Sequence, residues 1–251
     1  MIVWAMSGKE RFLEIDMARG IAIVMMIIFH TLFDLNFFGI APVDVYTGFW
    51  RYFAYATASL FLLIVGVSLT ISRARAAPHL TNRGLTRKYL LRGAGIFCCG
   101  LLVTVATWWY LREGFILFGI LHLIGVSVMI SPLFFRFRKW NAVIGLLVIV
   151  AGWDISTVNG PIWLLPLGFH PPSFWSVDYT PLLPWFGLVL IGLAAGDLLY
   201  PGGKRRFSMP APPPVAVSAL TFLGRNSLII YLVHQPVILA MLSLITGVPI
   251  L

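Results

Sequence analysis

Charged residues are scarce in this chain, and acidic residues are the scarcest. Only 11% of the 251 residues are charged, with 9 Asp and Glu against 18 Lys and Arg, whereas about a quarter of a soluble domain is charged. No polar segment is long enough to bury a core of its own, which argues against a separate soluble domain. The mean hydropathy is +0.92. We therefore expect an all-α, polytopic membrane helical bundle, with residues 1–251 forming one integral-membrane domain.

Cysteine is rare as well, and the last apolar stretch contains no lysine. Cys98 and Cys99 are adjacent within a predicted helix, so we expect no structural disulfide between them. The missing lysine argues against a retinal Schiff base. The sequence predicts no metal site.

The basic residues alternate along the chain in the manner of a membrane topology. All but Arg51 and Arg112 fall in four segments, which we expect to face the cytoplasm. This placement predicts a cytoplasmic N-terminus, an outer C-terminus and the plasma membrane as location, and it argues against a nucleic-acid partner. The four segments are 9–19, 73–92, 136–139 and 204–225.

The apolar stretches predict about seven membrane crossings. The segment 158–180 is too apolar for an exposed loop and too rich in proline for a full crossing, so a re-entrant or interfacial eighth element stays open. The predicted crossings are 15–38, 49–72, 93–110, 116–135, 141–156, 182–200 and 218–248.

The first crossing contains two ionisable residues, His30 and Asp34, four positions apart. This spacing places them on one face of a helix, about one turn apart. A titratable group in hydrocarbon costs several kcal/mol, so function is the default interpretation.

Position along the predicted crossings sorts the polar residues into two groups. We expect an outer group that could line a cavity and an inner group near the cytoplasmic mouth, where arginines suit phosphate or carboxylate. The outer group is His30, Asp34, His122, Asp154, Asp178 and, in a loop, His170. The inner group is Asp16, Arg19, Arg225, Asn226, Ser227, His234 and Gln235.

Several of these residues also have a purely structural interpretation. Asp16 and Arg19 could form an ion pair at a helix start. His234 could be an interhelical hydrogen-bonding residue. We expect His170, beside two prolines, to be exposed, and Asp154 to be an interfacial cap.

Four segments resemble short prokaryotic membrane proteins related to the catalytic domain of heparan-alpha-glucosaminide N-acetyltransferase, within a superfamily of transmembrane acyltransferases. The first is R-x-x-E-I-D-x-x-R-G followed by H-x-x-x-D, over Arg11 to Asp34. The others are FGILHLIG (118–125), DYTPLLPWFG (178–187) and FLGRNSLIIYLVHQP (222–236).

The resemblance implies transfer of an acyl group, acetyl first of all, from cytoplasmic acyl-CoA to an acceptor at the outer face. A membrane-embedded histidine is the catalytic group in such enzymes, and the position that matches is His30. The chain lacks the large luminal domain of the lysosomal enzyme, which puts heparan-type acceptors in doubt. Its expected partners are the lipid bilayer, acyl-CoA and a small-molecule or glycan acceptor, and a homo-oligomer stays open.

For this reaction, His30 could act as general base or as nucleophile. Asp34 could orient its imidazole, and His122 could stabilise an oxyanion or position the acceptor. Asp16, Arg19, Arg225, Asn226 and His234 are the candidate acyl-CoA ligands, and Asp154 and Asp178 the candidate acceptor ligands.

Two other classes compete with the acyltransferase. A proton-coupled transporter or flippase could use His30, Asp34 and His122 as a relay. A b-type haem protein could use paired membrane histidines as axial ligands.

Overall fold

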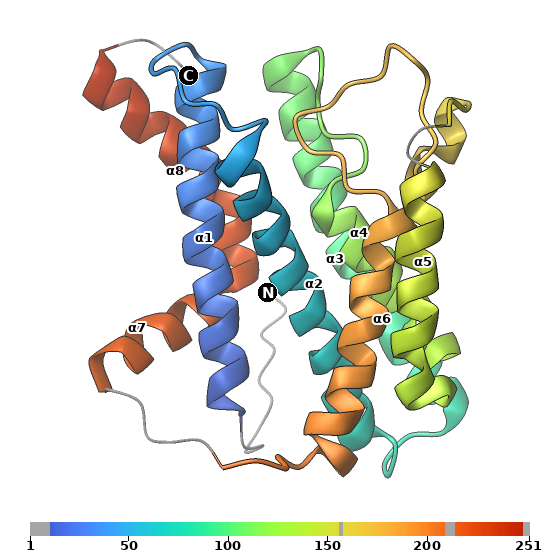
Figure 1. The fold of residues 1–251 in the computed structure, drawn as a ribbon. Coiled ribbons are helices and arrows are strands. Elements are labelled where there is room, and N and C mark those ends of the chain that lie inside the picture. The colour runs from blue at the N-terminus through green and yellow to red at the C-terminus, as the bar shows by residue number, and fades with distance from the viewer. Residues whose placement is uncertain (1–10, 156–157, 209–213, 248–251) are drawn as a thin grey trace. The chain divides into compact units, whose positions relative to one another are not determined.

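The computed structural model describes residues 11–155, 158–208 and 214–247. These residues are 77% helical and form eight α-helices and three short 3-10 helices (Figure 1). The described residues contain no strand, only an isolated bridge between Asn159 and His170. The predicted all-α polytopic fold is confirmed.

Within the described residues, six stretches of helix are long and apolar enough to cross a membrane. Five of them are single helices: α1 (Leu13–Phe37), α2 (Gly48–Ala76), α3 (Asn82–Leu111), α6 (Leu182–Leu199) and α8 (Ser227–Thr246). The sixth, Ile120–Trp153, holds two helices of 15 residues, α4 (Ile120–Phe134) and α5 (Asn141–Ile155), on either side of η1 (Phe135–Trp140). The sequence predicted two crossings there. Each helix is shorter than the ~20 residues of a typical crossing, and Arg138 in η1 has non-helical backbone angles.

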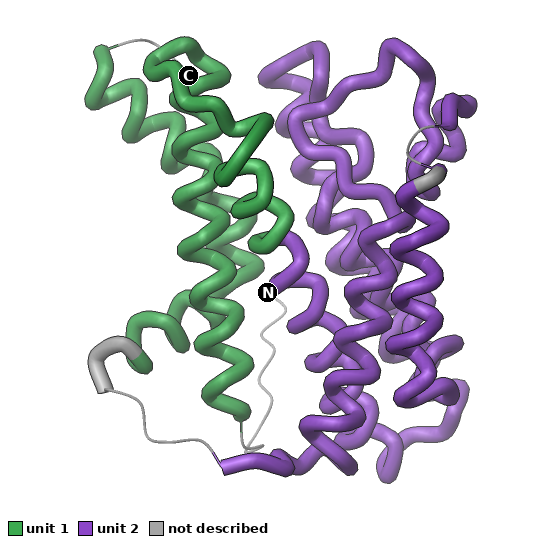
Figure 2. The backbone as a smooth tube through the Cα atoms, viewed as in Figure 1, with its two compact units in different colours: residues 1–57, 211–251 green, residues 58–210 purple. Residues whose placement is uncertain are grey.

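The chain forms two compact units (Figure 2). Unit 1 comprises residues 1–57 and 211–251, and unit 2 comprises residues 58–210. Helix α2 therefore begins in unit 1 and continues into unit 2. The prediction of one domain stays a prediction.

In unit 1, α7 (Pro214–Arg225) packs closely against the first half of α1. Two glycines permit this contact. A Cβ added to Gly20 would lie 2.1 Å from the backbone oxygen of Leu220, and one added to Gly224 would lie 1.8 Å from that of Asp16. Any side chain at either position would force the two helices apart.

The predicted last crossing, 218–248, is wrong in its first part. The helix is interrupted at Asn226, whose side-chain amide donates to the carbonyl oxygen of Phe222 at 2.8 Å. Asn226 has backbone angles outside the helical region, so α7 ends at Arg225 and α8 begins at Ser227. This competition by a short amide side chain for backbone groups is typical of asparagine at helix ends.

Helix α8 packs along the second half of α1. Its buried Ile238, Leu239 and Leu242 form a small core with apolar residues of α1 and the turn after it. The partners in this core are Ile27, Leu35, Phe38 and Ile40.

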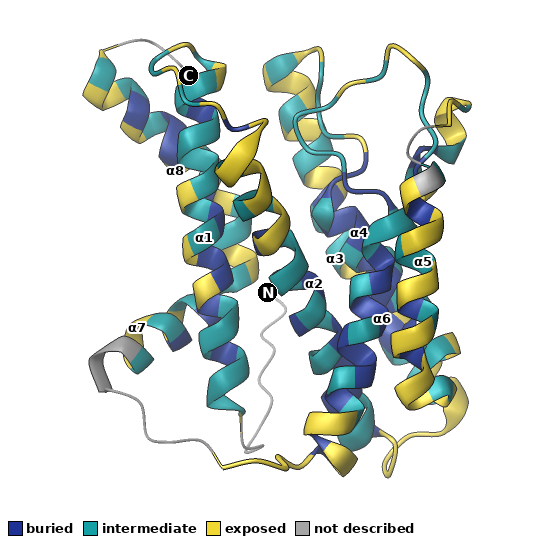
Figure 3. Ribbon diagram, viewed as in Figure 1, coloured by how far each residue is buried: buried dark blue, intermediate teal, exposed yellow. Residues whose placement is uncertain are grey.

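Unit 2 is built around α6, which packs against α5 and α2. Gly187 meets Gly145 of α5, and Gly192 meets Gly66 of α2, each close enough that a Cβ would collide with backbone. Figure 3 shows the buried residues gathered on α4 and α6, while α3 and α5 keep exposed apolar faces. Exposed apolar helix faces suit a bilayer, in which hydrocarbon rather than protein covers them.

The proline-rich segment 158–180 folds back onto unit 2. It contains η2 (Ile162–Leu167), whose Leu165 is buried in the core. Its last residues run beside the α3–α4 connection, where the amides of Val177 and Thr180 donate to Gly114 and Phe118. Whether the segment dips into the membrane stays a prediction.

Candidate functional site

Two histidines face each other in unit 1. The ring centroids of His30 in α1 and His234 in α8 are 4.8 Å apart, with an interplanar angle of 65°. The Nδ1 atom of His234 lies 2.6 Å from the carbonyl oxygen of Tyr231, one turn earlier in α8. His234 is buried, and His30 is partly buried.

Asp34 joins the same pair of helices one turn further along α1. The Nε2 atom of Gln235 donates to both carboxylate oxygens of Asp34, at 2.7 and 2.8 Å. Asp34 is only 1% exposed. The predicted common face of His30 and Asp34 is confirmed, since both reach α8. The carboxylate hydrogen-bonds Gln235 rather than the imidazole of His30, so Asp34 does not orient that ring directly.

The assignment of His234 and Gln235 to an inner group was wrong, because both lie beside the outer pair. The prediction counted the depth of His234 along a single helix that starts near Arg225. In the structure Gly224 of α7 lies against α1 between Asp16 and Gly20. A Cβ at Gly224 would lie 3.1 Å from the backbone nitrogen of Gly20. Ten residues separate Gly20 from His30, and ten separate Gly224 from His234. The ten residues from Gly224 to His234 include the break at Asn226 between α7 and α8, so the count from Arg225 does not give the position of His234 along α1.

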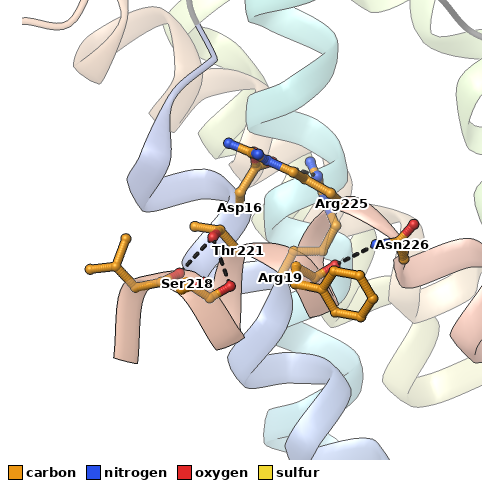
Figure 4. Close-up of polar contacts among 8 residues, drawn as sticks. Asp16, Arg19, Ser218, Thr221, Arg225 and Asn226 are labelled. Atoms are coloured by element: carbon orange, nitrogen blue, oxygen red, sulfur yellow. Dashed lines mark hydrogen bonds and ion pairs between the residues drawn. The ribbon is translucent and has the colours of Figure 1, made fainter. Parts of the chain in front are cut away.

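The Asp16 carboxylate holds two arginines where α1 meets α7 (Figure 4). Arg19 Nη1 lies 3.2 Å from Oδ1, and Arg225 Nε lies 3.2 Å from Oδ2. The predicted ion pair of Asp16 with Arg19 is confirmed, and Arg225 extends it across 209 positions of sequence. The Arg225 side chain is 48% exposed.

His122 lies in unit 2, near the start of α4. Its Nδ1 accepts from the backbone N–H of Gly119 at 3.2 Å, and its Nε2 lies 3.3 Å from Thr104 Oγ1. Because a nitrogen that accepts carries no proton, the neutral ring has its proton on Nε2 and donates to Thr104. The rings of Phe97 and Phe118 enclose it. One ring nitrogen therefore caps the start of α4, and the other joins α4 to Thr104 of α3.

Asp178 caps the same end of α4 from the loop before α6. Its Oδ2 accepts from the backbone N–H of Ile120 at 3.2 Å, and its Oδ1 accepts from Thr180 Oγ1 at 2.7 Å. A carboxylate at a helix N-terminus is favoured by the helix dipole. Burial raises the pKa of Asp178, although these two hydrogen bonds oppose the rise.

The remaining predicted residues lie elsewhere. Asp154 is near the end of α5, and its side chain is outside the described part of the chain. His170 was expected to be exposed but is partly buried against Phe174 and Tyr179. Among residues 11–155, 158–208 and 214–247, no three His, Cys, Asp or Glu side chains come together as metal ligands.

Sequence reasoning missed a cavity of about 240 Å³ in unit 2. Its charged lining is Arg73, Arg138 and Asp197. Arg73 is held in place by a 2.8 Å hydrogen bond to the carbonyl oxygen of Phe135. Asp197, an acidic residue inside a predicted crossing, was the available signal.

The fold and these sites define a multi-pass helical membrane protein that keeps ionisable residues inside its helices. A family model for the catalytic domain of heparan-alpha-glucosaminide N-acetyltransferase matches residues 11–236. The chain belongs to that family, which is of the membrane acetyltransferase type. The match covers both histidines of the His30–His234 pair, the Asp16 cluster and the His122 region.

No curated protein and no solved structure matches the chain. The family assignment therefore rests on the family model alone, and it confirms the resemblance predicted from the four sequence segments.

Proposed function

We propose that the chain is a membrane-embedded acyltransferase that moves an acyl group, most simply acetyl, from acyl-CoA to a hydroxyl or amine acceptor. The observation that carries this proposal is the pair His30 and His234, placed between two apolar helices in a chain of this family. Acyl transfer to a hydroxyl or amine needs a group that removes a proton from the attacking atom. An imidazole is the side chain best suited to that step near neutral pH.

The Asp16 cluster suits the donor end of the reaction. Acyl-CoA is anionic at its nucleotide end, and guanidinium groups bind phosphate with good geometry. Arg225 is tied to Asp16 through Nε only, and its side chain is half exposed. Fourteen residues of α1 separate Asp16 from His30, about 21 Å, a span that the thin pantetheine arm could follow. Asn226 and the basic inner segments could contribute further contacts.

His30 is the residue to which the family resemblance assigns catalysis, as general base or as nucleophile. Asp34 supports it indirectly, because its bonds to Gln235 hold α8 beside α1 at this level. We assign His122 and Asp178 to positioning, since their polar atoms already hold the start of α4. We also propose that the acceptor binds Asp154 or Asp178.

The positive-inside distribution supports a cytoplasmic N-terminus, so that α1 would run from an inner donor mouth to an outer acceptor site. This orientation, the plasma membrane as location, a glycan or small-molecule acceptor and a homo-oligomer are parts of the same proposal.

The test uses purified protein in proteoliposomes with acetyl-CoA and a panel of sugars and amino sugars. Release of free CoA thiol and acetylation of the sugar are followed together. We expect turnover by the wild type and a loss of at least about 100-fold in kcat for His30→Ala. The control is His79→Ala, because His79 is exposed in the turn before α3. Unchanged transfer by His30→Ala would contradict the role of His30.

An uptake measurement in the same proteoliposomes distinguishes an acyltransferase from a proton-coupled transporter. Sugar uptake driven by a pH gradient, without release of CoA, would replace the acyltransferase by the transporter. A protein that neither releases CoA thiol nor acetylates any sugar of the panel would overturn the proposed function.

A further inference from the structure

The tautomer of His234 is fixed by its own helix. A carbonyl oxygen only accepts, so the 2.6 Å contact with Tyr231 places the proton of the neutral ring on Nδ1. The other nitrogen, Nε2, then carries a lone pair. Backbone hydrogen bonds of this kind commonly decide which imidazole nitrogen is available for chemistry.

That lone pair is buried without a partner. Nε2 of His234 and Oε1 of Gln235 are both buried side-chain atoms with no hydrogen-bond partner among the described residues. His234 is 8% exposed. A buried acceptor left without a donor costs about 1–3 kcal/mol, and adjacent residues of α8 present two such atoms.

The orientation of Gln235 follows from Asp34. An ionised carboxylate can only accept, so the amide nitrogen must face it, as the contacts at 2.7 and 2.8 Å show. The amide oxygen is thereby turned away from Asp34. The Asp34–Gln235 contact thus fixes the orientation of an unpartnered acceptor on the residue next to His234 in α8.

Two other buried oxygens lack partners, those of Ser127 and Asn141 in unit 2. Neither belongs to a titratable group, and a serine hydroxyl can rotate toward any nearby acceptor. The pair on α8 differs because one member is a base and its ring faces a second histidine.

We propose that His234 Nε2 and Gln235 Oε1 form the binding site for the O–H or N–H group of the acyl acceptor, and that His234 is a second catalytic residue beside His30. This inference rests on the proposed function. As the acceptor attacks, its O–H or N–H bond breaks and the proton moves to Nε2. Its oxygen or nitrogen bonds to the thioester carbonyl carbon, and the C–S bond breaks. The leaving CoA thiolate takes up the proton from Nε2, which restores the neutral ring.

The site also defines a class of acceptor. Both available atoms only accept, so the ligand must bring hydrogens on or next to its reacting atom. A primary amine, or a hydroxyl with a second hydroxyl or amine beside it, satisfies both atoms. An N,N-dialkylated or O-methylated version of the same molecule leaves one atom unpaired and binds more weakly.

The test replaces His234 by two residues that separate its nitrogens. Asparagine in His234→Asn keeps an N–H near the position of Nδ1, and thus the bond to Tyr231, but has no atom at Nε2. Glutamine in His234→Gln reaches the Nε2 position with an amide that cannot take a proton. With the best acceptor of the sugar panel, we expect both variants to lose at least about 100-fold in kcat. The melting shift produced by acetyl-CoA should stay that of the wild type. His79→Asn is the matched control.

External imidazole provides a second measurement. It should restore part of the activity of His234→Ala, because the added base can take the proton that Nε2 would accept. Retention by His234→Asn of kcat within threefold of the wild type would overturn this inference, and so would the absence of rescue in a folded His234→Ala. In either case turnover by the wild type would leave the proposed function standing. A wild type without turnover would remove both.

Discussion

The two buried histidine sites of this chain differ in what their polar atoms bind. In unit 2, both ring nitrogens of His122 have partners, Gly119 and Thr104, and both oxygens of Asp178 accept from Ile120 and Thr180. In unit 1, His234 uses one nitrogen and leaves the other buried and unpartnered. The His122 site caps the start of α4, whereas the His234 site leaves a basic ring nitrogen available.

This difference shows why an ionisable residue inside a membrane helix is an incomplete sign of catalysis. His122 and His234 are the same type of residue, and each is buried within an apolar helix. His122 offsets the cost of its burial through two hydrogen bonds, one that caps the start of α4 and one that joins α4 to α3. At His234 an unpaired acceptor persists, and a cost of about 1–3 kcal/mol that folding does not recover points to a ligand.

The largest structural effect should come from breaking the helix crossing that places His234 opposite His30. In Gly224→Ala the new Cβ would lie 1.8 Å from the carbonyl oxygen of Asp16. We expect a loss of about 1–3 kcal/mol in the free energy of unfolding, measured by thermal melting in detergent, together with loss of transfer activity.

Gly95→Ala in α3 is the control, because nothing lies within 4 Å of that Cβ position. It should leave stability unchanged or raise it by up to about 1 kcal/mol, since alanine is the better helix former. Equal melting temperatures for the two variants would contradict the close crossing of α1 and α7.

The local parts of this arrangement could be predicted from the sequence. The spacing of His30 and Asp34 predicted their common face, and the spacing of Asp16 and Arg19 predicted their ion pair, because a helix turn alone decides both. The apolar stretches predicted nearly all of the helices. Such features depend on residues three or four positions apart.

The partners across the fold could not be predicted in the same way. His234 is 204 positions from His30, and its level depends on the break at Asn226 and on the glycine contact between α1 and α7. One sequence signal was available, since a glycine stands next to an arginine in both segments, as Arg19-Gly20 and as Gly224-Arg225. Capping of α4 by Asp178 likewise joins residues 58 positions apart.

A smaller effect should sharpen the contrast between the two histidines. His122→Ala removes the acceptor for Gly119 N–H and the donor to Thr104, so we expect a loss of about 1–2 kcal/mol in the free energy of unfolding. His122→Asn should recover part of it, because its side-chain oxygen can replace Nδ1 as acceptor for Gly119. Both are measured by thermal melting.

Measurements of kcat should distinguish the His122 site from the His234 site. Folded His122→Asn should keep a much larger share of kcat than His234→Asn, although both retain the atom nearest Nδ1. A loss of kcat in His122→Asn as large as that in His234→Asn, at equal melting temperature, would show that His122 takes part in the chemistry.

The smallest expected effect is the pH dependence of stability contributed by two carboxylates outside the crossings, Asp44 and Asp178. Asp44, in the turn before α2, accepts from Thr47 Oγ1 and from the backbone N–H groups of Tyr46 and Thr47. The hydrogen bond from the Thr47 side chain, followed by that from Tyr46, lowers the pKa of Asp44 below its ordinary 3.8. Its stabilisation is therefore present above the ordinary pKa and is lost as the pH falls through the lower native value.

The contribution of Asp178 to stability should change with pH in the opposite direction, because burial raises the pKa of Asp178. Its contribution is complete below the ordinary pKa and declines as the pH rises through the native value. Melting temperatures of wild type, Asp44→Asn and Asp178→Asn across acidic to neutral pH test this pair. The wild type should exceed Asp44→Asn at neutral pH and converge with it in acid, whereas its advantage over Asp178→Asn should grow in acid. If the melting temperatures of Asp44→Asn and Asp178→Asn changed in parallel with pH, the predicted opposite pKa shifts of the two carboxylates would be wrong.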